Sequence, residues 1–227
     1  MPTLVIANKT YSSWSMRPWL MLKELGVAFD EVMVPLDEAG TSEKLRRHSP
    51  SAKAPTYIDG ETTVWDSLAI MEYLSERYGL GRVWPADPAA RVLARCLSAE
   101  MHSGFGALRS KCPMNLGKHY AFRDRGPEVT RDATRIVEAW RDARARFGRG
   151  GPFLFGTFTA ADAMFAPVVT RFDTYGFTVE PDIRAYMDSV LGLASFREWR
   201  AAALAETWSV RADEVDETPL ADHRAPA

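Results

Sequence analysis

The stretch Lys-Ala-Pro-Thr-Tyr-Ile-Asp-Gly-Glu-Thr-Thr-Val-Trp-Asp-Ser, residues 53–67, decides how the first third of the chain folds. Pro55 fixes the backbone at the entrance to a short extended run, and Asp59-Gly60 is a dipeptide that tight hairpin turns favour. Residues 62–65 supply the returning strand. Residues 68–78 then carry apolar side chains at a helical spacing. The stretch therefore predicts two hairpin strands followed by the start of a helix.

The end of this stretch places a carboxylate and a hydroxyl side by side. Ser67 would begin the helix, where backbone N–H groups lack intrahelical partners and can bind a carboxylate. Asp66, directly before it, offers a negative charge to an ammonium group. These two adjacent residues could therefore hold an amino-acid head group, which carries both charges.

Strand and helix signals alternate on either side of this stretch. Residues 4–7 are apolar, residues 15–25 follow a helical pattern that stops at Gly26, and residues 29–36 are extended. A weaker helix over residues 42–48 leads to the hairpin. A compact strand-helix-strand unit implies a right-handed parallel crossover. We therefore predict the order βαβαββα.

The strand signals disappear after Asp87-Pro88, a helix cap followed by proline at the first helical position. Apolar stripes at spacings of three and four residues run through 93–108 and 129–147. We expect a first domain over residues 1–82, an all-helical domain over residues 87–212 and a disordered tail over 213–227, which is acidic and contains proline.

The bulk composition excludes several classes of protein. The formal net charge of −2 argues against a nucleic-acid partner. We find no secretory signal, no run long enough for a membrane span and no metal-ligand cluster among the four scattered histidines. Cys96 and Cys112 fall within one predicted helical stretch, about 24 Å apart at the helical rise, which is too far for a disulfide. We therefore expect a cytoplasmic protein without membrane or metal partners.

Three segments resemble a known family. Residues 11–17, Tyr-Ser-Ser-Trp-Ser-Met-Arg, resemble the Ser-Ser-Cys-Ser-x-Arg element of zeta-class glutathione transferases. Residues 48–55, His-Ser-Pro-Ser-Ala-Lys-Ala-Pro, resemble the Asn-Pro-x-x-Lys-Val-Pro segment of the cytosolic family, and residues 66–70 match its acidic-or-Gln, Ser, apolar run. The resemblance covers residues 4–208. It implies an α/β thioredoxin-like N-terminal domain (βαβαββα) that binds glutathione, followed by an all-α C-terminal domain for the second substrate and dimerisation.

The resemblance also assigns binding roles to single residues. It implies that Pro55 is a cis proline and that the backbone of Ala54 pairs with the cysteinyl part of glutathione. Asp66 and Ser67 would hold the ammonium and carboxylate of the γ-glutamyl group. Lys53 would reach the glycine carboxylate.

A hydroxyl in the loop after the first strand would ionise the glutathione thiol. An ordinary thiol pKa is near 8.5, and lowering it by about two units needs about 2.7 kcal/mol. One hydroxyl donated to a charged acceptor contributes about 1.5 to 3 kcal/mol. Ser12 is the first candidate because it matches the leading serine of the family element, while Ser13, also a predicted glutathione contact, and Tyr11 are the alternatives. Without the resemblance, Ser12, Ser13 and Ser15 would be interpreted as residues that cap the following helix. We prefer this interpretation for Ser15.

The resemblance places the second substrate beside the helical domain. Trp14, Met101, His102 and Phe105 are the candidates for lining an apolar pocket for a small hydrophobic electrophile, although such a stripe also fits a helix packed into the core. Trp14 stands where the zeta element has cysteine, which disfavours the zeta-type isomerisation of maleylacetoacetate.

We expect an enzyme of the glutathione transferase type (EC 2.5.1.18), with glutathione as cosubstrate, a role in detoxification and, from the resemblance, a homodimeric state. It would activate the thiol for conjugation to, or isomerisation of, a small electrophile. The alternative is a non-catalytic interaction module with the same fold. Lys53, Pro55, Asp66 and Ser67 favour the enzyme, because a module needs no head-group clamp.

Overall fold

A computed structural model describes residues 1–224 of the chain. The first half holds β1 (Thr3–Ile6), α1 (Ser13–Glu24), β2 (Asp30–Met33), α2 (Thr41–Arg46), β3 (Thr56–Asp59), β4 (Thr62–Trp65) and α3 (Ser67–Tyr78). This is the predicted βαβαββα order. Strands β1 and β2 are parallel, β3 is antiparallel to β1 and β4, and the sheet order is β2-β1-β3-β4.

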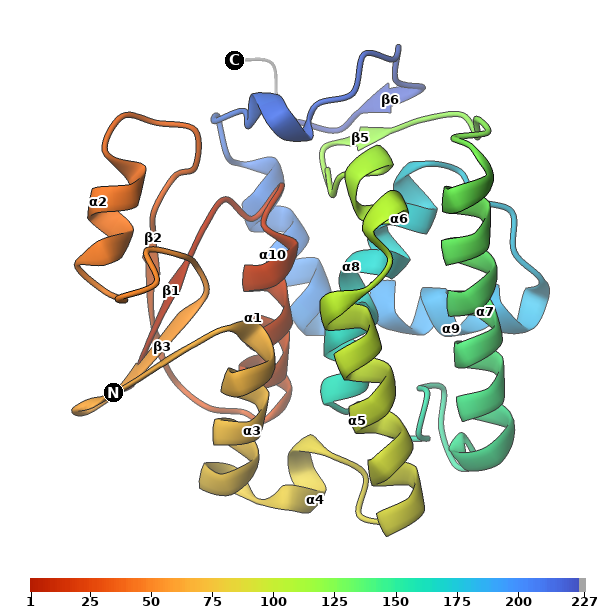
Figure 1. Cartoon of the computed structure of the whole chain (residues 1–227), viewed down its shortest axis with the longest axis horizontal. Coiled ribbons are helices and arrows are strands. Elements are labelled where there is room, and N and C mark those ends of the chain that lie inside the picture. The colour runs from red at the N-terminus through yellow and green to blue at the C-terminus, as the bar shows by residue number, and fades with distance from the viewer. Residues whose placement is uncertain (225–227) are drawn as a thin grey trace.

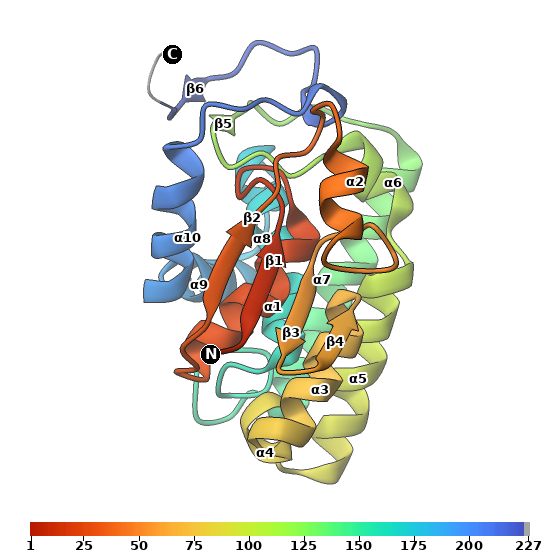
Figure 2. The ribbon, with the colours of Figure 1, turned by 90° about the vertical axis from the view of Figure 1, so that its left-hand side faces the viewer.

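The sheet separates two apolar layers, because successive side chains of a strand point to opposite faces. Leu4 and Ile6 of β1 belong to the main core, which α1 and α3 share. Val5 between them packs with Leu45 of α2 on the other face. Figure 2 shows α2 in front of the sheet and α1 behind it. The hairpin loop is Gly60-Glu61, one residue later than predicted, since Asp59 pairs with Thr62.

Helices make up most of the second half (Figure 1). They are α4 (Leu80–Val83), α5 (Pro88–Ser103), α6 (Gly106–Lys111), α7 (Pro127–Phe147), α8 (Ala160–Thr174), α9 (Pro181–Leu191), α10 (Ala194–Leu204) and the 3-10 helix η1 (Arg211–Asp213). The two-residue strands β5 (Lys118–His119) and β6 (Ala221–Asp222) pair antiparallel. No helix in residues 1–224 is both long and apolar enough to cross a membrane.

Helix α8 lies at the centre of the helical domain and packs against α1. All but one of its residues are buried, as expected of a helix that is apolar on every side. Its start is fixed by a capping box, in which the Asp162 carboxylate accepts bonds from the backbone N–H of Thr159 at 2.9 Å and of Leu154 at 3.0 Å. Burial raises the pKa of Asp162 to about 6. This anchored helix carries Arg171 toward the first domain.

The predicted single helix through Cys96 and Cys112 is wrong. Helix α5 ends at Ser103, and Phe105 follows in the left-handed region with a φ of 57° before α6 begins. Cys96 is exposed on α5, and Cys112 is buried beyond the end of α6. The apolar spacing continued across the break because it reports which residues are buried, whether or not the helix is continuous.

The expectation of a disordered tail is wrong for residues 213–224. Glu214 accepts a bond from the Tyr11 hydroxyl at 2.6 Å and pairs with Lys118 at 2.6 Å. Glu217 forms a two-bond pair with Arg125, at 2.6 and 2.8 Å. Acidic residues that a composition argument assigns to solvent therefore meet cations from distant segments. Residues 225–227 lie outside the described part of the chain.

Candidate active site between the two domains

Two cavities meet beside the loop that follows β1. One has a volume of about 730 Å³; we call it the head-group cavity. The other has a volume of about 720 Å³; we call it the arginine cavity. Their shared walls are Trp14, Lys53, Ala54 and Arg109. The head-group cavity is also lined by Ser51, Pro55, Trp65, Asp66, Ser67 and His102. The arginine cavity also contains Tyr11, Ser12, Ser13, Met114, Arg171 and Asp213.

Asp66 and Ser67 lie together at the N-terminus of α3, as the sequence predicted. Asp66 is the N-cap residue, with a φ of 77°, and its Oδ1 accepts the Leu68 N–H at 2.8 Å. Its Oδ2 lies 3.2 Å from Nε2 of His102, which reaches across from α5. Ser67 is fully buried, and its Oγ accepts a bond from Nη1 of Arg17 at 3.4 Å. The carboxylate and the hydroxyl therefore line one cavity.

Lys53, Ala54 and Pro55 form another wall of the head-group cavity. The Ala54–Pro55 peptide bond is cis. Neither the N–H nor the C=O of Ala54 has a backbone partner within residues 1–224. The Lys53 ammonium makes no ion pair with that part of the chain. This wall therefore offers an open strand edge and a free cation.

The three candidate hydroxyls lie where the loop after β1 enters α1, but they have different partners. Ser12 caps α1, and its hydroxyl donates to Oγ of Ser15 at 2.8 Å. Tyr11 donates to Glu214, and burial together with that bond raises the pKa of Tyr11 to about 12. The Ser13 hydroxyl lines the arginine cavity and has no hydrogen-bond partner in residues 1–224. Of the three, Ser13 is the hydroxyl whose hydrogen is free to meet a ligand.

The arginine cavity has a charged lining and does not match the apolar pocket that the sequence predicts for an electrophile. Arg171 is buried, and its guanidinium donates to the carbonyl oxygens of Cys112 at 2.9 Å and Pro167 at 3.0 Å. Burial, aided by repulsion from Arg109, lowers the pKa of Arg171 to about 10. Burial also lowers the pKa of Arg109. Asp213 is the only acidic residue lining this cavity within the described chain. The cavity therefore carries an excess of positive charge.

The four residues proposed for the pocket divide into two pairs. Trp14 lines both cavities, with the guanidinium groups of Arg17 and Arg109 at 4.2 and 4.7 Å from its ring centroid. His102 meets the Trp14 ring edge-on at a centroid distance of 5.1 Å and lines the head-group cavity. Met101 and Phe105 line neither cavity and belong to the core, so their proposed role is wrong.

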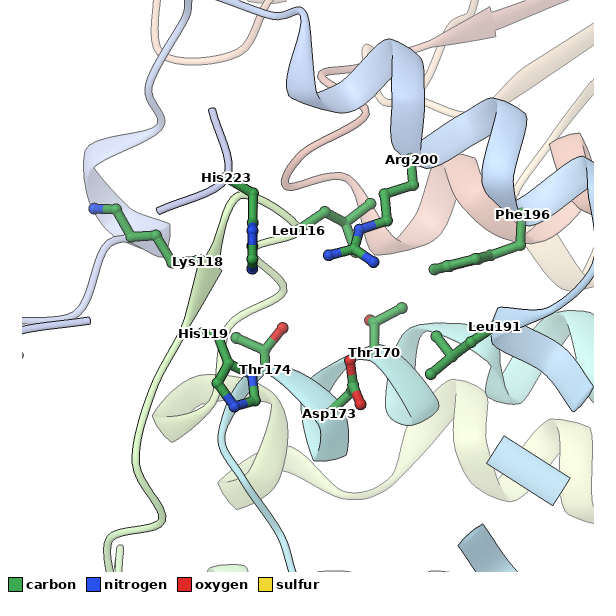
Figure 3. A pocket seen from close by; sticks show the side chains of 10 residues that line it. All are labelled: Leu116, Lys118, His119, Thr170, Asp173, Thr174, Leu191, Phe196, Arg200 and His223. Carbon is green, nitrogen blue, oxygen red and sulfur yellow. The ribbon is translucent and has the colours of Figure 1, made fainter. Parts of the chain in front are cut away.

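A third cavity shares no lining residue with these two. Figure 3 shows it between β5, α8, α10 and the tail, with His119, His223 and Asp173 among its lining side chains. Its volume of about 60 Å³ suits a few water molecules rather than a tripeptide. Asp173 is moreover paired with Arg184 at 3.0 Å. This small cavity is therefore not a candidate for the active site.

Sequence reasoning missed three charged residues that line this site or its walls, Arg109, Arg171 and Asp213, and one that packs behind it, Arg17. Arg17 was quoted as the last residue of the family element but received no role. Arg109 and Arg171 carry no local signal, because helices distant in the sequence bring them together. Asp213 lies in the tail that was expected to be disordered.

Two family models match the chain. The glutathione S-transferase N-terminal domain matches residues 11–77, and the glutathione S-transferase C-terminal domain matches residues 126–202. Together these matches cover more than half of the chain.

Relatives are found among curated proteins. A probable maleylacetoacetate isomerase of Caenorhabditis elegans is 33% identical over 109 residues, which is 48% of this chain and 50% of that protein. A stringent starvation protein A homolog of Coxiella burnetii is 28% identical over 190 residues, or 84% of this chain and 86% of that protein. The match to the isomerase thus spans about half of its length.

Solved structures share the fold. A glutathione transferase homolog from Burkholderia, crystallised with bound glutathione, has a TM-score of 0.67 at 24% identity and covers 89% of this chain and 97% of its own. A theta class glutathione S-transferase from Xanthomonas axonopodis has a TM-score of 0.59 at 22% identity and covers 87% and 95%. Since both family models match in order and the fold agrees, the chain belongs to the glutathione S-transferase family.

Proposed function

We propose that this protein is a glutathione transferase, which binds glutathione in the head-group cavity and directs its thiol toward an electrophile in the arginine cavity. The observation that carries the proposal is the arrangement of the head-group cavity. Asp66 and Ser67 line it beside the open backbone of Ala54 and the free ammonium of Lys53. A γ-glutamyl peptide presents the complementary groups, namely an ammonium, two carboxylates and an extended backbone.

Glutathione would supply the reactive sulfur, and the chain would stabilise its ionised form. Trp14 and Arg109 belong to the wall shared by the two cavities, and Ser13, next to Trp14, lines the arginine cavity, so a sulfur held at the junction would face both the Ser13 hydroxyl and the arginines. A hydroxyl donor and nearby cations both favour a thiolate over a thiol. The homodimer, the cytoplasmic location and the role in detoxification remain predictions from the sequence.

Retention on immobilised glutathione, followed by turnover of a panel of activated electrophiles, tests the proposal. We expect specific elution by free glutathione and a rate above the uncatalysed reaction. The names of the stringent starvation protein A homologs state no reaction, so the non-catalytic module remains the competing hypothesis. Retention without turnover across the whole panel would favour it, and absence of retention would refute glutathione binding.

The excess positive charge of the arginine cavity favours an anionic electrophile over the small hydrophobic one expected from sequence. It also keeps isomerisation of an organic acid open as a second activity, in line with the isomerase relatives. A carboxylate would compensate Arg109 and Arg171, which form no ion pair within the described residues. The name of the relatives' substrate and the charge of this cavity thus point to the same chemical class.

A matched pair of substrates measures this preference. We expect a chlorodinitrobenzoate to be used with a higher kcat/KM than its methyl ester, relative to their uncatalysed rates. Arg109→Met should reduce that ratio about tenfold, the effect of losing one charge-assisted hydrogen bond. Arg95→Met, which removes a cation paired with Glu72 outside the cavities, is the control. An unchanged ratio in Arg109→Met would argue against an anionic electrophile.

A further inference from the structure

Arg17 is a buried cation without an acidic partner. It lies on α1 with 1% of its surface exposed, and its guanidinium packs on the Trp14 ring. Its one hydrogen bond within the described chain is from Nη1 to Oγ of Ser67, at the long distance of 3.4 Å. Its buried Nε has no partner in that part of the chain. The protein therefore keeps a charge in its interior that the fold itself does not neutralise.

Such a charge is costly to the free protein. Burying an ionised group without a partner costs several kcal/mol in general. Burial is the main reason why the pKa of Arg17 falls to about 9, with further repulsion from Arg171 and Arg109 and a smaller opposing effect from Asp66. Arg17 is still cationic at neutral pH. An unsatisfied buried group of this kind is often explained by a functional role.

The bond to Ser67 determines where that serine can donate. Because Arg17 donates to Oγ, the hydroxyl hydrogen of Ser67 has to point away from the guanidinium. Ser67 lines the head-group cavity and is the first residue of α3, where the backbone N–H groups also lack helical acceptors. The Ser67 hydroxyl, the N-terminus of α3 and the buried charge of Arg17 therefore all favour a negatively charged group at one end of the cavity.

The charges around Ser67 are complementary to those of an amino-acid head group. Asp66 places a negative charge at the cavity, and Arg17 places a positive charge behind Ser67. We propose that Arg17 is a positioning residue for the γ-glutamyl carboxylate of glutathione, acting through Ser67, which it orients as a donor and backs with a positive charge. This inference rests on the proposed function.

Calorimetry with two peptides tests this role. The probes are glutathione and 4-aminobutyryl-Cys-Gly, which lacks only the carboxylate of the γ-glutamyl group. Arg17→Met should weaken glutathione binding about tenfold and the analogue less than twofold. Arg17→Gln keeps a donor for Ser67 without the charge and should lie between Arg17→Met and the parent protein. Arg17→Lys should restore most of the affinity.

Two further measurements separate this role from a purely structural one. In the Ser67→Ala background, Arg17→Met should weaken glutathione binding less than in the parent protein, because the two residues act as one unit. Lys23→Met removes an exposed cation from the same helix and should leave both affinities unchanged. Circular dichroism checks that each variant is folded. If Arg17→Met does not fold, Arg17→Gln and Arg17→Lys test the positioning role in its place.

Three outcomes would overturn the inference. Equal weakening of both peptides would assign Arg17 to the packing of α1 against α3. Unchanged affinity for glutathione in every Arg17 variant would remove it from the site. If the Arg17 variants raise the pKa of the bound thiol without changing the affinity, Arg17 acts on the sulfur rather than on the carboxylate. If the parent protein binds neither peptide, the proposed function itself fails, which is a distinguishable result.

Discussion

Removing the charge of Asp66 or the hydroxyl of Ser67 is expected to weaken glutathione binding ten- to hundredfold in each case. Each change strands one charge of the γ-glutamyl group, and losing a charge-assisted hydrogen bond costs about 1.5 to 3 kcal/mol. Asp66→Asn is preferable to Asp66→Ala. Asp66 also caps α3 through the Leu68 N–H, and asparagine keeps that acceptor.

Isothermal titration calorimetry at neutral pH measures these losses. His102→Gln is an informative companion, because His102 contacts the same carboxylate at 3.2 Å without belonging to α3. Lys53→Ala should cost less than either change, since its partner carboxylate stays solvated. Parent-like affinity in both Asp66→Asn and Ser67→Ala would rule out the head-group cavity as the glutathione site.

The second large effect concerns ionisation of the thiol. Ser13→Ala should raise the pKa of bound glutathione by about 1.5 units, because its hydroxyl is the unpaired donor and would supply about 2 kcal/mol. With a parent thiol pKa near 6.5, the ionised fraction and hence the rate at pH 7 should fall about eightfold, and the deficit should shrink as the pH rises. Glutathione affinity should change little, because the binding energy comes from the charged ends and the backbone of the peptide.

Ser12→Ala and Tyr11→Phe, measured in parallel, are the matched comparisons. The sequence favoured Ser12, but its hydroxyl hydrogen already bonds to Ser15, so we expect a smaller shift. Tyr11→Phe should leave the thiol pKa unchanged, since Tyr11 donates to Glu214. The readout is the ultraviolet absorbance of the bound thiolate against pH. A larger shift for Ser12→Ala than for Ser13→Ala would return the role to Ser12.

Local chemistry made the first domain predictable. The residues from Lys53 to Ser67 set their own conformation through a proline, a hairpin turn and a helix cap, so their elements could be anticipated to within a residue or two. The Thr159 to Asp162 capping box at the start of α8 is local in the same sense, because its partners are three residues apart. Interactions between neighbours in sequence leave a pattern in the sequence.

The second cavity could not be anticipated in this way. Arg109 and Arg171 come from α6 and α8, and their proximity depends on how these helices pack. The apolar stripe through Met101 and Phe105 predicted burial correctly but could not say whether the buried side chains face a cavity or the core. The charge of the pocket is therefore a tertiary property.

The C-terminal tail, which lies outside the residues matched by the family models, contacts the loop and the cavity of the candidate active site. The family models end at residue 202, yet Glu214 holds Tyr11 in the loop after β1, and Asp213 lines the arginine cavity. Substitutions in this terminal segment can reshape the cavity while leaving both matched domains intact. A short segment outside both matched domains thus helps to shape the arginine cavity, and an affinity tag for biochemistry belongs at the N-terminus.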